Sequence, residues 1–258
     1  MRYLLRLDVM SNEPLLSIIT VSAFDSQRLA NTLNSLIEVR SSIEHVVVVP
    51  KSYLESIAIL RSHSVSVPHP VILVNDEKQG VYPAMNIGAN AATGKYLCFW
   101  NAGDELNSPE ELNALLESLN ARSPKWVICQ GNFQWRKDQE LSSSNLAGFV
   151  RHKSDTFISH QTVIMQRVAF MGVGMFDSRY RVAADTAMIT QLYLMEEPRW
   201  EHSVVVKVET PEFASRNHRQ ARIEVLLIVF RELRGSQRSQ AIRNIFHTET
   251  RRLIEKLK

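Results

Sequence analysis

The segment from Gly80 to Asp104, GVYPAMNIGANAATGKYLCFWNAGD, contains the residues whose types and spacing point most directly to chemistry. It predicts a helix of small residues, a glycine turn and a buried strand that ends at Asn101-Ala102-Gly103-Asp104. A carboxylate at a strand exit, beside a glycine that allows close backbone approach, suits a hard divalent cation and its phosphate partner. The competing interpretation of an aspartate after a glycine is a turn residue.

Other polar residues have both a chemical and a structural interpretation. Asp185 stands before a helical stretch, where it can act as a helix N-cap or as a base. His160 can be a buried, hydrogen-bonded histidine or part of a site, and Asp177 is better explained as a turn residue or cap. His218 lies in a polar stretch with Arg216 and Arg219, which suits either a phosphate contact or a solvated loop.

Buried-type strands alternate with helical spacing through the first half of the chain. The expected strands are 15–22, 44–49, 71–74, 96–100 and 126–130, and the expected helices are 26–39, 52–62, 83–92 and 108–119. This alternation predicts an α/β fold with a mostly parallel sheet and right-handed crossovers. Ligands of such sheets bind at the carboxyl ends of the strands, so Thr20–Ser22, Pro50–Lys51 and Asn101–Asp104 are expected on one rim.

The second half is less regular. We expect loop or edge strand over 133–152, a short strand over 162–165, a helix over 184–193 and a strand over 204–208. The last forty residues read as two helical segments broken at Gly235. The predicted organisation is therefore one domain over 1–215, followed by a basic, amphipathic helical extension over 216–258.

Composition is ordinary for a soluble globular protein, with 45% hydrophobic and 22% charged residues among 258. Cys98 and Cys129 lie in apolar runs and are interpreted as buried free thiols of a reducing compartment. The first ten residues lack the apolar core of a signal peptide, and no apolar stretch is long enough to span a bilayer. These features predict a cytoplasmic protein.

The net charge of +3 is unevenly distributed. Residues 216–258 hold 11 Lys and Arg against 4 Asp and Glu, a net +7, which leaves −4 on the remainder. Apolar residues recur at helical spacing between these basic residues, which is typical of a helix that lies on an anionic membrane surface. The alternative is packing against the rest of the chain or in a homodimer. A nucleic-acid partner is disfavoured, because no recognised motif and no aromatic–basic interleaving is present.

Three segments, Leu16–Leu36, Gly80–Asp104 and His160–Thr190, resemble family 2 glycosyltransferases, most closely the bacterial subgroup that builds polysaccharide repeat units. The matches come in order over roughly the first 190 residues. The resemblance implies a GT-A (Rossmann-like) fold and transfer of a sugar from a nucleotide-diphosphate donor to a glycan or lipid-linked saccharide. It further implies inversion at the anomeric carbon, dependence on Mn²⁺ or Mg²⁺, and a role in lipopolysaccharide or capsule synthesis at the inner face of the plasma membrane.

The resemblance also implies roles for individual residues. Asp185 matches the general base, and Asp104 matches the carboxylate that holds the metal. Independently of the resemblance, the polar loop around His218 makes that residue a further candidate metal ligand. His160 and Gln161 match the acceptor side. The residues expected to bind the donor are Thr20, Ser22, Asp76, Tyr82, Met85, Asn86, Asn101 and Asp104.

Three positions depart from the family pattern. The acidic motif that commonly follows the second strand is replaced by Val49-Pro50-Lys51-Ser52. Pro83 stands where the family has an aspartate before Ala-Met-Asn, and Lys78 stands where an aspartate precedes the glycine, although Asp76 and Glu77 are close. These departures concern recognition of the base, and they leave open a catalytically inactive GT-A-like binding or scaffold protein.

Overall fold

The computed structural model describes residues 2–4, 13–22, 25–40, 42–77, 80–133, 158–209 and 217–243, with the backbone alone for 2–4 and 218. The strands are β1 (Arg2–Leu4), β2 (Leu16–Val21), β3 (Ile43–Pro50), β4 (Val71–Asp76), β5 (Tyr96–Asn101), β6 (Glu105–Leu106), β7 (Trp126–Phe133), β8 (Val163–Gln166) and β9 (Arg199–Val208). The helices are α1 (Ser26–Ser35), α2 (Leu54–Ser66), α3 (Val81–Ala91), α4 (Pro109–Arg122), η1 (His160–Thr162), α6 (Arg167–Gly172), α7 (Ala184–Met195) and α9 (His218–Glu232).

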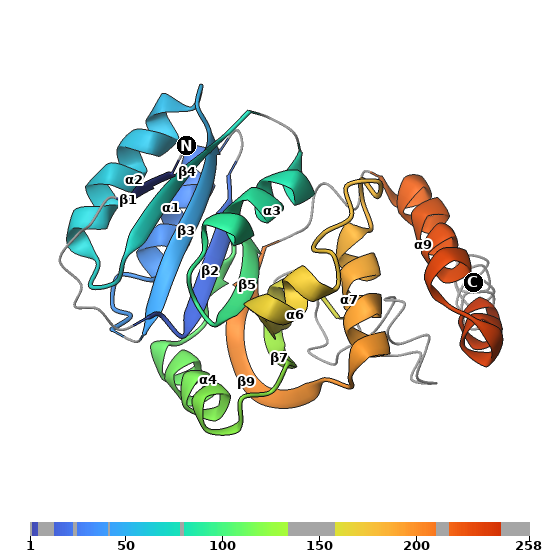
Figure 1. The fold of residues 1–258 in the computed structure, drawn as a ribbon. Helices are drawn as coiled ribbons and strands as arrows, with labels where there is room; N and C mark the ends of the chain where they lie inside the picture. The colour runs from blue at the N-terminus through green and yellow to red at the C-terminus, as the bar shows by residue number, and fades with distance from the viewer. Residues whose placement is uncertain are drawn as a thin grey trace, which may run out of the picture.

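One sheet runs through the molecule in the order β1-β4-β3-β2-β5-β8-β7-β9-β6 (Figure 1). β4, β3, β2 and β5 are parallel neighbours, which confirms the predicted parallel α/β core. Val21 pairs with Val48 on one side and with Asn101 on the other, and Pro50 pairs with Asp76. The ends of these four strands therefore lie along one carboxyl edge, as expected from the sequence.

The far half of the sheet mixes directions. β8 is antiparallel to both β5 and β7, whereas β7 and β9 are parallel with two shifts of register. β9 begins at Arg199, ahead of the predicted start at Val204, and its first residues are largely exposed. Those residues have no apolar pattern, so pairing with β7 rather than side-chain burial makes them a strand. Of the stretch 133–152, Phe133 ends β7 and the rest lies outside the described residues.

Helix starts follow local capping chemistry. Asp25 accepts the Arg28 N–H at 3.0 Å before α1, and Ser108 accepts the Glu110 and Glu111 N–H groups before α4. Asp and Ser suit these positions, because their side chains satisfy orphan N–H groups of the first turn. α1 ends at Ser35, earlier than the predicted end at Val39.

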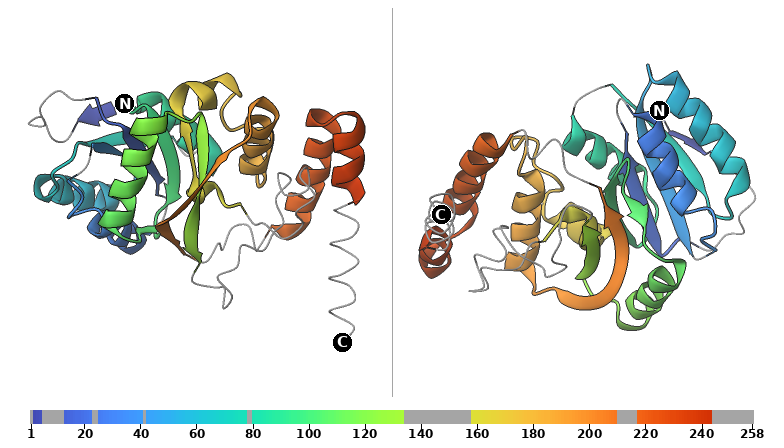
Figure 2. Two further views of the ribbon diagram at one scale, coloured as in Figure 1. Left: turned by 90° about the horizontal axis from the view of Figure 1, so that it is seen from below. Right: turned by 180° about the vertical axis from the view of Figure 1, so that it is seen from behind.

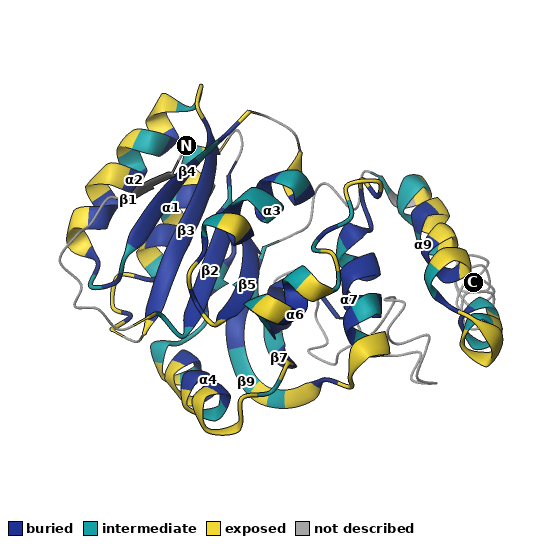
Figure 3. Cartoon of the chain, in the orientation of Figure 1, coloured by how far each residue is buried: buried dark blue, intermediate teal, exposed yellow. Residues whose placement is uncertain are grey.

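Helices cover both faces of the sheet (Figures 1 and 3). α3, α6 and α7 pack on one face over Ile19, Phe99 and Ile128, and α1, α2 and α4 cover the other face. Cys98 on β5 and Cys129 on β7 are free, buried thiols as predicted, and burial raises the pKa of both. No helix within the described ranges combines the length and the apolar character needed to cross a membrane.

α9 lies beside α7 at one end of the molecule (Figure 2). Its residues Ile228 and Val229, together with Leu233 and Ala241, are fully buried in the same cluster as Met188 of α7. The core thus continues across the boundary predicted at residue 215. The predicted break between two helices falls at 233–234, just before Gly235, and residues 235–243 are again helical. The tail beyond 243 lies outside the described residues.

Candidate active site

Asp104 closes the turn at the end of β5. Its Oδ2 accepts the Asn101 N–H at 2.7 Å, and its Oδ1 accepts the Glu209 N–H at 3.1 Å. The residue is 2% exposed. Burial raises the pKa of Asp104, while these two N–H groups, the charge of His160 and hydrogen bonding by Gln161 oppose the rise. The turn interpretation of Asp104 is therefore confirmed, and the hydrogen bonds that close the turn also fix the carboxylate. The role of Asp104 in a site stays a prediction.

An ion pair that the sequence analysis missed lies over this turn. Arg28 of α1 contacts Glu209, just after β9, with 2.5 Å between Nε and Oε2. Thr32 of α1 accepts the Gly103 N–H at 2.8 Å. Arg28 and Glu209 are 181 residues apart, so no local sequence pattern relates them. Together they hold α1 and the end of β9 against the Asp104 turn.

Gly103 is required by both conformation and space. Its φ is +103°, and a Cβ there would overlap the Glu209 carboxylate. We expect Gly103→Ala to cost the roughly 1–2 kcal/mol of a left-handed alanine, plus the displacement of Glu209 from Arg28. Urea denaturation of the purified chain measures this loss.

Gly174→Ala is the matched control, because Gly174 has φ +88° and no atom within 4 Å of the added methyl group. The control is expected to lose only the conformational part. Equal losses in the two variants would contradict the steric role assigned to the Glu209 contact.

His160 and Gln161 lie in η1, between the Asp104 turn and the start of α7. The His160 Nδ1 atom is 3.4 Å from Oδ2 of Asp185. Its Nε2 atom is buried and has no hydrogen-bond partner in the described part of the chain. Buried polar atoms are rarely left unpaired, so this nitrogen marks a position that a ligand or water can fill. The structure thus brings the predicted acceptor-side residues together with both predicted carboxylates.

Asp185 lies in the first turn of α7 with its side chain 22% exposed. Its Oδ1 accepts the N–H of the next residue, Thr186, at 2.7 Å. The N-cap of α7 is Ala183, so the predicted N-cap role of Asp185 is wrong. Tyr82 of α3 approaches the same place and donates its hydroxyl to the Val182 carbonyl at 2.8 Å. Burial and then the charge of Asp185 raise the pKa of Tyr82 well above its usual range, which keeps the phenol neutral.

Residues of β2 and β4 predicted to bind the donor are mostly enclosed. Thr20 is fully buried and joined to the His45 Nε2 by a 2.9 Å hydrogen bond, so it has no surface to offer a ligand. Ser22 directly follows the same strand, and its buried hydroxyl has no partner among the described residues. Asp76 ends β4 and accepts the Glu77 N–H at 2.6 Å. Ser22 and Asp76 lie at the carboxyl edge, whereas Thr20 supports it from within.

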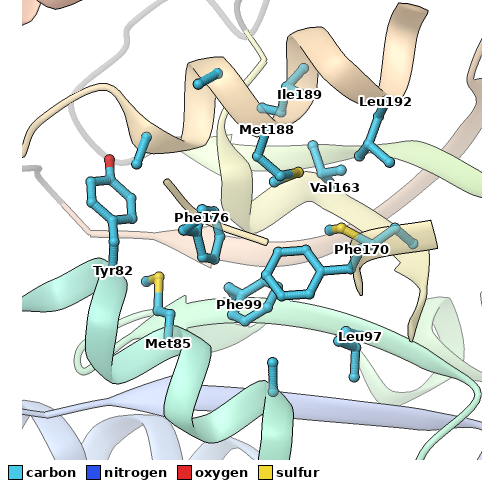
Figure 4. Close-up of a cluster of buried hydrophobic side chains, with 14 of the residues drawn as sticks. Tyr82, Met85, Leu97, Phe99, Val163, Phe170, Phe176, Met188, Ile189 and Leu192 are labelled. Carbon is cyan, nitrogen blue, oxygen red and sulfur yellow. The ribbon is translucent and has the colours of Figure 1, made fainter. Parts of the chain in front are cut away.

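Met85 of α3 lies within the core beneath the site (Figure 4), and the half-buried Asn86 of the same helix contacts the Phe176 backbone. Met85 is fully buried near Tyr82 and Phe99, so it has no exposed surface for direct donor contact. Asn86 uses both ends of its amide on the Phe176 backbone, donating to the carbonyl at 2.8 Å and accepting the N–H at 3.1 Å. These contacts fix the loop that leads to α7. For His218, the backbone begins α9, and the side chain lies outside the described residues.

A separate cleft of about 680 Å³ opens at the opposite edge of the sheet. Its lining includes Leu15 and Lys95, which precede β2 and β5, together with Arg40 and Glu117. Ligands of parallel sheets bind at the carboxyl ends of the strands. We therefore assign the site to the Asp104 edge, where the polar atoms converge, rather than to this cleft.

The sequence model described as Glycosyl transferase family 2 matches residues 17–173, which include β2, the Asp104 turn and the His160–Gln161 pair. The chain belongs to glycosyl transferase family 2. Asp185 and α9 lie beyond the matched range.

Relatives in sequence agree with this membership. An uncharacterized glycosyltransferase of Mycobacterium tuberculosis is 25% identical over 219 residues, covering 82% of this chain and 80% of the relative. A PGL/p-HBAD biosynthesis glycosyltransferase of Mycobacterium bovis is 31% identical over 121 residues, covering 45% and 44%. Both are family-level similarities that cover different shares of the chain.

The fold matches solved glycosyltransferases of the GT-A type. The mannosyltransferase PcManGT from Pyrobaculum calidifontis, solved with GDP-Man and Mn²⁺, has a TM-score of 0.69 at 17% identity, covering 90% of this chain and 68% of that one. S. aureus TarS 1-349 has a TM-score of 0.67 at 14% identity, covering 90% and 70%. The GT-A fold predicted for this family 2 glycosyltransferase is thereby confirmed.

Proposed function

We propose that this family 2 glycosyltransferase is an active, inverting enzyme that uses Asp185 as its general base. The observation that carries the proposal is the approach of His160 to Asp185 at 3.4 Å, with the other imidazole nitrogen buried and unpaired within the described structure. Solved neighbours are complexes with UDP-GlcNAc and with GDP-Man, which supports a nucleotide-sugar donor. The proposed acceptor is a glycan or a lipid-linked saccharide of bacterial surface polysaccharide.

The reaction is a single displacement. Asp185 takes the proton of the acceptor hydroxyl as its oxygen attacks the anomeric carbon, and the bond from that carbon to the donor phosphate breaks. His160 beside Asp185 orients the carboxylate, and its unpaired nitrogen is available to the acceptor or to a bound water. Tyr82, held on the Val182 carbonyl, lies close enough to the Asp185 carboxylate to interact with it electrostatically.

We also propose that Asp104 holds a divalent cation together with the donor diphosphate. The described residues include no group of three or more ligand side chains, so the protein alone does not enclose a metal. Asp104 nevertheless suits a cation whose other ligands are phosphate oxygens of the donor. Burial disfavours the negative charge of this carboxylate, and a bound cation would compensate that charge. A bound Mn²⁺ or Mg²⁺ supplies Lewis-acid stabilisation of the leaving diphosphate.

A thermal-shift screen tests the donor and metal assignments together. The full chain is heated with UDP or GDP, each with and without Mn²⁺, and the melting temperature Tm is compared. We expect one nucleotide to raise Tm in a Mn²⁺-dependent manner, because ligands that bind only the folded state stabilise it. No response to any nucleotide would instead favour the inactive binding or scaffold alternative.

We propose further that the enzyme docks on the inner face of the plasma membrane through the outer face of α9. Ile223, Leu226, Leu227 and Phe230 recur at helical spacing there and are between 41% and 60% exposed (Figure 3). Three exposed arginines, Arg219, Arg222 and Arg231, lie along the same face. An apolar strip flanked by arginines suits an anionic bilayer, whereas a two-fold copy of the chain would bring like charges together.

Flotation of the full chain with vesicles tests this surface. We expect binding to vesicles that contain phosphatidylglycerol and little binding to phosphatidylcholine alone, since each basic residue near an anionic surface adds about 1 kcal/mol. The double variant Leu227→Glu/Phe230→Glu should abolish flotation. The matched control is Leu54→Glu/Val65→Glu, which changes two apolar residues exposed on α2. Failure of the unmodified chain to float would contradict the membrane assignment.

A further inference from the structure

We infer that Glu224 of α9 is a positioning residue for Asp185, an inference that rests on the proposed function. The residue is 6% exposed, and its carboxylate faces the segment that leads into α7. Oε1 accepts the Arg181 N–H at 3.0 Å, and Oε2 accepts the Val182 and Ala183 N–H groups, both at 2.8 Å. Gln220, one turn earlier in α9, donates to Oε1 at 2.9 Å.

Three consecutive N–H groups that converge on one carboxylate fix the path of the backbone. Successive N–H groups in such a turn form an anion-binding concavity, and here the anion is a side chain from another helix. Ala183, the residue before α7, has no side chain able to cap the helix. Glu224 therefore determines where α7 begins and how its first turn is oriented.

Two contacts connect this segment to the candidate reaction centre. The Val182 carbonyl, next to the N–H groups held by Glu224, accepts the Tyr82 hydroxyl at 2.8 Å. Asp185 follows Ala183 by two residues and reaches His160 through Oδ2. A shift of the 181–183 backbone thus moves both Tyr82 and Asp185 relative to His160.

The donors to Glu224 identified in the described structure are three backbone N–H groups and one amide, all neutral. A buried carboxylate held by neutral donors loses its solvation without a salt bridge in return, so stability alone does not favour an ion at this position. Glutamine has nearly the same volume, but its NH₂ group would face N–H donors. Glu224→Gln therefore perturbs the hydrogen bonds while it keeps the packing.

The test measures kcat, KM for the donor, nucleotide binding and Tm in the full-length Glu224→Gln enzyme. We expect kcat to fall about 10- to 100-fold, since a small misplacement of a reacting group has effects of this size. The KM for the donor should change little, and so should the Mn²⁺-dependent increase in Tm that the nucleotide causes. Glu224→Asp keeps the charge with a shorter reach and should lose less activity, which provides a second folded variant.

Glu232→Gln is the matched control. Glu232 lies two turns further along α9 and accepts a hydrogen bond from Gln191, near the other end of α7. The same carboxylate-to-amide change there should leave kcat within about two-fold of the unmodified enzyme. That change is smaller than the fall in kcat expected when a reacting group is misplaced.

A double-variant cycle separates positioning from general stability. If Glu224 acts through Asp185, Glu224→Gln should reduce kcat no further once Asp185 is Asn. A normal kcat in Glu224→Gln, or an equal loss in both backgrounds, would overturn the positioning role while leaving the base assignment intact. Full activity of Asp185→Asn alone would overturn the base assignment itself, and that measurement is independent of Glu224.

Discussion

Asp185→Asn is expected to lower kcat by about 10² to 10⁴-fold, the usual contribution of a positioned general base. The amide oxygen of asparagine can still accept the Thr186 N–H, so the start of α7 should keep its geometry. Donor binding should also persist, because Asp185 contacts His160 and Thr186 rather than the Asp104 turn. Steady-state kinetics with excess acceptor, and nucleotide-induced Tm shifts, measure the two properties separately.

Asp177→Asn is the control for this experiment. Asp177 lies in the loop before α7 and pairs with Arg179 at 2.6 Å, away from His160. The control should keep its turnover. A loss of donor binding in Asp185→Asn, together with unchanged turnover of bound donor, would move Asp185 from the reaction to the donor pocket.

Asp104→Asn is expected to reduce kcat/KM by about 10³-fold, because metal stabilisation of a leaving group contributes several kcal/mol and each 1.4 kcal/mol is tenfold. The Mn²⁺-dependent Tm shift with nucleotide should disappear as well. Asparagine would also turn an NH₂ group toward the N–H of Asn101 or Glu209, so a loss of about 1–3 kcal/mol in stability is expected without ligand.

Thr32→Val controls for that loss of stability. It removes the hydroxyl that accepts the Gly103 N–H in the same turn, and it leaves the carboxylate in place. The control should be destabilised yet keep its response to Mn²⁺ and nucleotide. An Asp104→Asn protein that responds to Mn²⁺ like the unmodified chain would refute the metal assignment.

The fold could be predicted where side-chain pattern and burial agree. Ile18, Ile19 and the valines of β3 are buried on both faces of a parallel sheet, so their strands appear as continuous apolar runs. β9 was recognised only from Val204 onward, because its first half is held by pairing with β7 and has no apolar run. Helix caps such as Ser108 can be recognised in a sequence, because a capping side chain stands at a fixed spacing from the N–H groups that it accepts.

The candidate site could be predicted only in part. The ordered motifs point to Asp104, His160 and Asp185, and the structure places His160 in contact with Asp185 and within electrostatic range of Asp104. Arg28 with Glu209, and Glu224 with residues 181–183, are contacts between distant segments that no spacing rule reveals. One feature of the sequence does point to Glu224. It stands one helical turn before Ile228, so both residues lie on the buried face of α9.

The two thiols provide an internal probe of how the sheet opens. Cys98 and Cys129 are each 2% exposed, on β5 and β7, the two strands that flank β8. Burial raises the pKa of both, so neither thiol reacts until its strand is exposed to solvent. The rate of alkylation at each cysteine therefore reports local opening on its side of β8, without any introduced label. Equal rates would mean that the two halves of the sheet open as one cooperative unit.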